Sequence, residues 1–270
     1  MRVGCAQLNS RDDREANLKA AEAAIVTLAE AGARLVMLPE HFDFIGPEQA
    51  KREHAKPLVE AGWLPRFRAL SRSCGIYLHI GSFLEKAGER LYNTGVVIDP
   101  AGTIIASYRK IHLFDVEIPG GLCYRESDLI TPGDTVVTCT IDGVVFGMAT
   151  CYDLRFPELF RRLVSHGATV LLVPAAFTLQ TGRDHWEVLL RARAIENLCW
   201  VVAAGQWGTA PPEHLLYGRS MVINPWGVVV AQASDGVTTI VADLDLEELH
   251  RVRQRFPALQ HRRMDLFGER

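Results

Sequence analysis

The sequence predicts an α/β fold, with sheets in the middle and helices outside. Short apolar runs alternate with longer segments whose apolar residues recur three and four positions apart, which indicates strand-helix-strand units. Other runs are joined by tight turns such as Asn224-Pro225-Trp226-Gly227, which indicates hairpins. The 270 residues, of which 48% are hydrophobic, can bury a large core. Because no linker or compositional break divides them, we expect one domain over residues 1–270.

Strands and helices are expected in turn along the first half of the chain. Its helices, over residues 12–31 and 58–73, carry apolar groups on one face, and Gly32 ends the first of them. Glu40 and Lys110 each follow closely after a strand. The expected strands are apolar runs over residues 2–8, 35–38, 76–84, 91–98 and 104–108.

The second half continues this alternation, with helices expected over residues 157–164 and 183–197. Residues 112–134 mix charged residues with glycine and proline and are too irregular for one element. Long loops in compact domains are often functional. The expected strands cover residues 144–149, 168–173, 200–204, 221–223, 228–231 and 238–242.

Cys151 stands at the turn between the strand over residues 144–149 and the helix over residues 157–164. A side chain there projects from the C-terminal end of a strand, and free backbone N–H groups of the turn lie near it. This placement suits a nucleophile whose intermediate is stabilised by N–H donors. The alternative is a buried core thiol, the usual role of a free cysteine.

Three strand ends, at Glu40, Lys110 and Cys151, each carry one group that acyl transfer requires. A carboxylate can take the thiol proton and later activate water, a lysine can hold the developing oxyanion, and a thiolate can attack an amide carbonyl. Taken alone, Glu40 and Lys110 are typical of solvated loops. The pattern alone does not show that the three strand ends converge.

Composition argues against several other classes of protein. The formal net charge is −3 and no long Lys/Arg block is present, so we expect neither a nucleic-acid nor a membrane-surface partner. No apolar run approaches the ~20 residues of a membrane-spanning helix, and no leader-like segment precedes the first strand, so a cytoplasmic location is expected. The six cysteines form no C-x-x-C pair and the nine histidines form no metal-binding motif, so we expect no metal and no organic cofactor.

Three separated motifs closely resemble the nitrilase, or carbon-nitrogen hydrolase, superfamily. They are L-P-E at 38–40, Y-R-K-I-H-L-F-D at 108–115 and C-Y-D-L-R-F-P-E at 151–158. The motifs occur in the family's order, and the resemblance extends from the first strand to the C-terminus. It implies a single-domain, four-layer αββα sandwich that forms homodimers and hydrolyses a small-molecule amide.

The same resemblance implies roles for four residues. Glu40 would be the general base, Lys110 the oxyanion stabiliser and Cys151 the nucleophile. Glu126, in Y-R-E-S at 124–127, matches the family's second glutamate, which would position substrate and Lys110. The alternative for Glu126 is a surface loop carboxylate.

Further segments resemble one branch of the superfamily, the amidases that hydrolyse deaminated glutathione to 2-oxoglutarate and cysteinylglycine. The neighbouring ω-amidases, which act on 2-oxoglutaramate and 2-oxosuccinamate, resemble the segment after Glu40 less well. An alternative from a different class is a catalytically idle scaffold that keeps the fold and only binds partners. The segments are F-D-F-I-G at 42–46, D-V-E-I-P-G at 115–120, H-W-E-V-L-L-R-A-R-A-I-E at 185–196 and Q-H-R-R at 260–263. How the loop at 121–123 fits either branch stays open.

Arg155, four residues after Cys151, has two interpretations. It could receive a substrate carboxylate, or it could form an ion pair with Asp153 or Glu158. The resemblance also implies substrate contacts at Tyr152, Phe177, Thr181 and His185.

Overall fold

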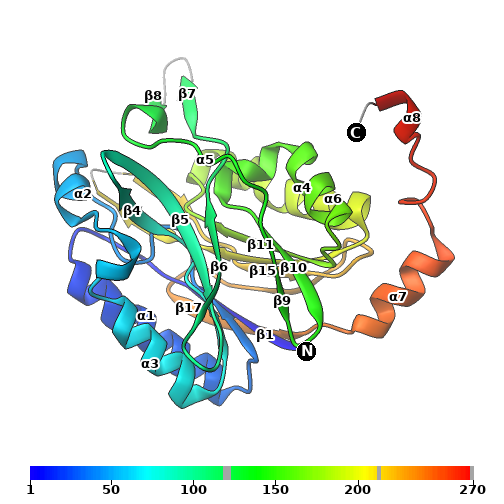
Figure 1. Ribbon diagram of the computed structural model, residues 1–270, viewed down its shortest axis with the longest axis horizontal. Helices are drawn as coiled ribbons and strands as arrows, with labels where there is room; N and C mark the ends of the chain where they lie inside the picture. Colours follow the sequence, from blue (N-terminus) through cyan, green and yellow to red (C-terminus); the bar gives the residue numbers. More distant parts are fainter. Residues whose placement is uncertain (118–122, 212–213, 268–270) are drawn as a thin grey trace.

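Two β-sheets pack face to face between two layers of helices in this computed structural model, which describes residues 1–117, 123–211 and 214–267 (Figure 1). The prediction of a single-domain αββα sandwich is confirmed by the three apolar clusters that separate the four layers. Gly121 and Leu122, in the loop whose fit stayed open, lie outside the described residues. No helix in the described ranges is long and apolar enough to cross a membrane.

The first sheet has seven strands, in the order β17-β1-β2-β3-β5-β4 with β6 also paired to β5. Strands β1, β2 and β3 are parallel, and the other pairs are antiparallel. Glu40 lies just after the C-terminal end of β2, at the edge where the parallel strands end. The bounds are β1 Arg2–Gln7, β2 Leu35–Met37, β3 Tyr77–His79, β4 Phe83–Ala87, β5 Arg90–Ile98, β6 Ile104–Arg109 and β17 Thr238–Asp243.

The second sheet has six strands, in the order β16-β15-β12-β11-β10-β9, and β10, β11 and β12 are parallel. Its strands are β9 Thr138–Ile141, β10 Val144–Met148, β11 Val170–Ala175, β12 Trp200–Gly205, β15 Met221–Ile223 and β16 Val229–Gln232. Two antiparallel ribbons lie outside both sheets. They are β7 Asp115–Glu117 with β8 Cys123–Arg125, and β13 Trp207–Ala210 with β14 His214–Tyr217.

Alternation along the strands decides which side chain enters which core. Leu35 and Met37 of β2 face the second sheet and share a core with Phe146, whereas Val36 and Leu38 face the outer helices. Helices α1 and α3 cover the first sheet, and α4 and α6 cover the second (Figure 1). The helices are α1 Arg14–Glu30, α2 Glu48–His54, α3 Leu64–Cys74, α4 Pro157–Ser165, α5 Leu179–Thr181, α6 Glu187–Asn197, α7 Leu246–Arg255 and α8 Met264–Phe267.

The structure corrects two predicted elements. The expected strand over residues 76–84 is two strands, β3 and β4, which are separated at residues 80–82. A Cβ atom on Gly81 would overlap the carbonyl oxygen of Pro39, so only glycine allows this close approach of the backbone at Gly81 to the segment after β2. The expected helix over residues 58–73 is a 3-10 turn at Leu58–Glu60 followed by α3. Sequence patterning also misses α2, α7 and the β13-β14 ribbon.

Candidate active site

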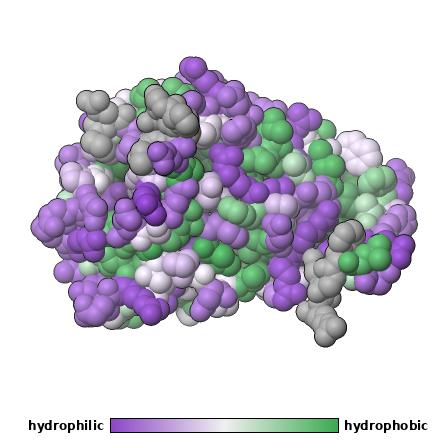
Figure 2. Space-filling view, turned by 90° about the horizontal axis from the view of Figure 1, so that it is seen from above, coloured by the Kyte–Doolittle hydropathy of each residue, from purple (hydrophilic) through white to green (hydrophobic). Residues whose placement is uncertain are grey.

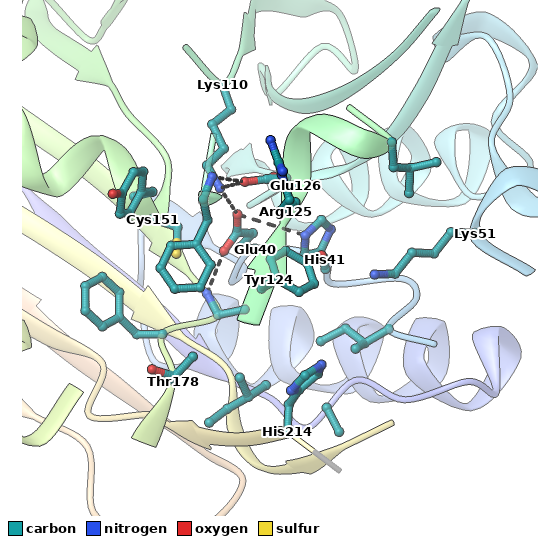
Figure 3. A pocket seen from close by; sticks show the side chains of 18 of the residues that line it. Glu40, His41, Lys51, Lys110, Tyr124, Arg125, Glu126, Cys151, Thr178 and His214 are labelled. Carbon is teal, nitrogen blue, oxygen red and sulfur yellow. Dashed lines mark hydrogen bonds and ion pairs between the residues drawn. The ribbon is translucent and has the colours of Figure 1, made fainter. Parts of the chain in front are cut away.

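A cavity of about 340 Å³ opens where strand ends of the two sheets meet. Glu40 and Lys110 reach it from the first sheet, Cys151 from the second, and Glu126 from the 3-10 turn at Glu126–Asp128 (Figure 3). The structure thus brings together the four residues that the sequence nominates for catalysis. All four are buried, with exposed fractions of 2%, 2%, 8% and 4% respectively.

Glu40 is held by donors from both sheets. Its Oε1 accepts hydrogen bonds from Lys110 Nζ at 3.1 Å and from Asn93 Nδ2 at 2.9 Å. Its Oε2 accepts one from the backbone N–H of Ala176, just after β11, at 2.8 Å. The carboxamide of Gln206, just after β12, donates to the backbone carbonyl of Glu40 at 3.0 Å. The carboxylate therefore bridges the two sheets.

Lys110 lies between two carboxylates. Its ammonium donates to Glu126 Oε2 at 2.8 Å in addition to its bond with Glu40. Glu126 is itself fixed, because the backbone N–H of Phe114 donates to the same oxygen at 2.7 Å and Asn93 Nδ2 donates to Oε1 at 3.3 Å. Asn93 is a polar residue inside the apolar run of β5, which was the sequence signal that could have identified it.

Cys151 opens the 3-10 turn Cys151–Arg155 in a left-handed backbone conformation, with φ of 48°. Such a conformation is rare for residues other than glycine and is concentrated at functional sites. In Figure 3 the sulfur points toward the carboxylate of Glu40. His41, directly after Glu40, is also left-handed, with φ of 53°.

Burial and charge fix the resting protonation of the site. Burial raises the pKa of the Cys151 thiol well above its usual value, and the Glu40 carboxylate adds to this, while Lys110 opposes it. Burial would raise the pKa of Glu40 too, but the charges of Lys110 and His41 outweigh it and lower that pKa to about 2. Burial lowers the pKa of Lys110, but Glu126 and Glu40 outweigh burial and raise it. The site at rest holds a neutral thiol, an ionised carboxylate and an ammonium.

Asp153 connects β6, the strand before Lys110, to the 3-10 turn that begins at Cys151. Its fully buried carboxylate accepts the Tyr108 hydroxyl at 2.6 Å and the backbone N–H of Thr150 at 2.8 Å. The other oxygen accepts the backbone N–H of His112 at 3.0 Å and lies 2.7 Å from its Nδ1. Asp153 is thus occupied by these groups and not by Arg155.

Replacing Asp153 with Asn should reduce both stability and rate. At least one buried donor loses its acceptor, which costs about 1–3 kcal/mol of unfolding free energy. The loosened strand end and turn should lower kcat by on the order of 10-fold or more, since small displacements of reacting groups are costly. Urea unfolding and steady-state kinetics measure the two effects, with the exposed Asp12→Asn as control. Wild-type values for Asp153→Asn in both measurements would remove this positioning role.

The cavity wall contains most, but not all, of the predicted substrate contacts. Tyr152, Arg155, Phe177 and Thr181 line it. His185 is not among the described lining residues and instead lies behind Arg155, with Nδ1 3.3 Å from Nη1. The guanidinium of Arg155 lies over the rings of Tyr152 and Phe177, at 5.7 and 5.3 Å from their centroids. Lining residues that sequence analysis missed include His41, Lys51 and His214.

One group of possible metal ligands lies in the cavity. Single ligand atoms of Glu40, His41 and Glu126 fall within 4.8 Å of one another. The ammonium of Lys110 already bonds both carboxylates, so a cation there would have to displace it. The expectation of metal independence stays a prediction, which dialysis against EDTA would test.

Comparison with known proteins gives consistent matches. A family model described as carbon-nitrogen hydrolase matches residues 2–254. Deaminated glutathione amidase of Bos taurus is 44% identical over 273 residues, covering 98% of the chain and 83% of that protein. Deaminated glutathione amidase of Synechocystis is 42% identical over 262 residues, covering 95% of the chain and 96% of that protein. The crystal structure of the Caenorhabditis elegans NitFhit protein superposes with a TM-score of 0.91 at 39% identity, covering 98% of the chain, which spans 65% of that structure's length.

Proposed function

The chain belongs to the carbon-nitrogen hydrolase family, and from that premise we propose that it hydrolyses the amide bond of deaminated glutathione to 2-oxoglutarate and cysteinylglycine. The observation that carries the chemistry is the buried cluster in which Glu40 and Lys110 face the thiol of Cys151. The substrate rests on the two relatives that bear this activity in their names. The cavity of about 340 Å³ lies within the ~300–1,000 Å³ range of small-molecule sites.

In the proposed acylation step, the sulfur of Cys151 attacks the amide carbonyl while its proton passes to Glu40. The raised pKa of the thiol and the lowered pKa of Glu40 disfavour a free thiolate at rest, so we infer that the proton transfer accompanies formation of the S–C bond. The ammonium of Lys110 stabilises the negative charge that develops on the carbonyl oxygen. When the C–N bond breaks, Glu40 returns the proton to the leaving amine, and a thioester remains on Cys151.

Deacylation reuses the same groups. Water gives a proton to Glu40 and its oxygen attacks the thioester carbonyl, again with Lys110 beside the oxyanion. The C–S bond then breaks, the proton returns to the sulfur, and 2-oxoglutarate leaves. Glu126 takes part by orienting Lys110, because its bond to the ammonium is fixed by the backbone of Phe114.

Arg155 would receive the carboxylate of the oxo acid half. It belongs to the same turn as Cys151, lines the cavity, and forms no ion pair with Asp153 or Glu158 in the described structure. Tyr152, Phe177 and Thr181 would complete the cavity wall around the oxo acid half of the substrate.

The test compares kcat/KM for deaminated glutathione with kcat/KM for 2-oxoglutaramate. We expect deaminated glutathione to be the better substrate. A clear preference for 2-oxoglutaramate would assign the chain to the ω-amidases instead. No turnover of either compound, together with no substrate-sized mass adduct on the protein, would support the idle scaffold.

We also propose a homodimer, as the family resemblance implies. Large apolar side chains exposed on α6, Val188 at 67% and Ile195 at 47%, could form part of an interface. The face seen in Figure 2 is largely hydrophilic, with hydrophobic residues interspersed. Light scattering would distinguish a dimer from a monomer. The cytoplasmic location and the absence of a nucleic-acid partner stay predictions from the sequence.

A further inference from the structure

Lys51 places a further cation in the cavity, in addition to Lys110, Arg125 and Arg155. It comes from α2 and lines the cavity wall. Figure 3 shows it on the far side of Glu40 from Cys151, with its side chain directed toward the cavity. Within the described parts of the chain its ammonium makes no hydrogen bond and no ion pair. Burial lowers the pKa of Lys51, while Glu126, Glu48 and Glu40 partly offset this effect.

The catalytic carboxylates do not need Lys51. Glu40 and Glu126 already receive donors from Lys110, Asn93 and two backbone N–H groups. An ammonium without a partner in a partly closed cavity is a costly arrangement unless a ligand supplies the anion. Arg125 also lines the cavity, but its side chain is largely exposed and lies 3.9 Å from the carboxylate of Asp128. Among the described residues, Lys51 is therefore the cation without a partner that is available to a substrate at its end of the cavity.

Two further groups stand beside Lys51 on the cavity wall. Tyr124 and His214 line the same space, and their rings meet edge to face at 6.1 Å. Burial, and then the charge of Lys51, lower the pKa of His214, so its imidazole is neutral at pH 7. Burial raises the pKa of Tyr124 to about 12, so its hydroxyl keeps its proton. Neither side chain is hydrogen-bonded within the described ranges, and each can donate to a carboxylate.

We propose that Lys51, with Tyr124 and His214, binds the C-terminal carboxylate of the dipeptide leaving group. This subsite rests on the function proposed above. The glycine carboxylate lies two residues, about 7 Å, from the scissile amide, whereas the oxo acid arm is shorter. Arg155 belongs to the same turn as the nucleophile, so it suits the carboxylate of the shorter oxo acid side. Lys51 lies beyond Glu40, so it suits the carboxylate of the longer dipeptide side. The subsite would explain a preference for the dipeptide amide over the primary amide.

The test measures kcat/KM for Lys51→Met on two substrates. For deaminated glutathione we expect a loss of about 10- to 100-fold, mainly through KM, which is typical of a lost charge-assisted bond. For 2-oxoglutaramate, which lacks the dipeptide, the loss should be at least about 10-fold smaller. Lys51→Arg should recover part of the difference because it keeps the charge. The exposed Lys56→Met, two residues beyond the end of α2, is the matched control and should behave as wild type.

A second substrate tests the contact directly. Deaminated glutathione with its glycine carboxylate converted to an amide should be a poorer substrate for the wild type. Lys51→Met should add little to that loss, because mutation and amidation remove the same interaction. The assignment would be wrong if Lys51→Met lowered kcat/KM by the same factor for both unmodified substrates, or did not lower it at all. It would also be wrong if the losses from the mutation and from amidation of the substrate were additive. If the wild type itself fails on deaminated glutathione, the proposed function fails along with the subsite.

Discussion

Cys151→Ala should remove turnover while leaving the fold intact. Removing the nucleophile of an acyl-transfer enzyme lowers kcat by on the order of 10⁶-fold. The substitution deletes one sulfur atom at a backbone that stays in place through the Asp153 bonds. Intact-mass spectrometry of a quenched reaction should show an acyl adduct on the wild type and none on the variant.

Cys139→Ala is the matched control. Cys139 is also buried, but it lies on β9 in the core between the two sheets and outside the cavity. Its removal should cost about 1 kcal/mol of stability and leave the adduct unchanged. A substrate-sized adduct on Cys151→Ala would assign the nucleophile to another residue. Alkylation rates are a poorer test, because the raised pKa of Cys151 keeps its thiol protonated at rest.

Glu40→Gln should lower kcat by on the order of 10²- to 10⁴-fold, the usual contribution of a general base. The amide cannot take the thiol proton. It also replaces one oxygen with an NH₂ group that faces Lys110, Asn93 or the backbone of Ala176, all of which are donors. Steady-state kinetics beside the exposed Glu60→Gln would measure the effect. A kcat close to wild type would place the base elsewhere.

The lowered pKa of Glu40 gives a related expectation for pH dependence. Its folded pKa of about 2 lies below its ordinary value of 4.5, so ionised Glu40 stabilises the fold fully above about pH 4.5. That stabilisation is lost as the pH falls toward 2. The kcat/KM profile should therefore show no loss from Glu40 protonation between pH 5 and 8. An acid limb in that range that disappears in Glu40→Gln would contradict the assignment.

Periodicity predicted most of the fold because the central elements bury one face and repeat at 2.0 or 3.6 residues. Periodicity failed where contacts between distant segments determine the local structure. Helix α2 contains a single apolar residue, Ala50, so it offers no apolar stripe to recognise. The break between β3 and β4 contains Gly81, whose backbone lies against Pro39, forty-two residues earlier in the chain.

The candidate site was also predictable only in part. Glu40, Lys110 and Cys151 stand in motifs that can be recognised one at a time, so their residue types and local positions were predictable. Their convergence depends on the packing of the two sheets. The role of Asn93, which bonds both carboxylates from the middle of β5, depends on the contacts that bring Glu40 and Glu126 beside that strand. Lys51 and His214 lie on elements that the sequence patterns miss. No local signal could have placed them in the cavity.

The bridging of Glu40 between the sheets has a consequence for folding. Glu40 and Lys110 extend from one sheet, while Cys151, the N–H of Ala176 and the carboxamide of Gln206 extend from the other. Neither half can assemble the reacting groups by itself. During refolding from denaturant, recovery of activity would therefore report the docking of the two halves, whereas circular dichroism reports formation of their secondary structure. Any lag between the two signals would give the rate of that last step.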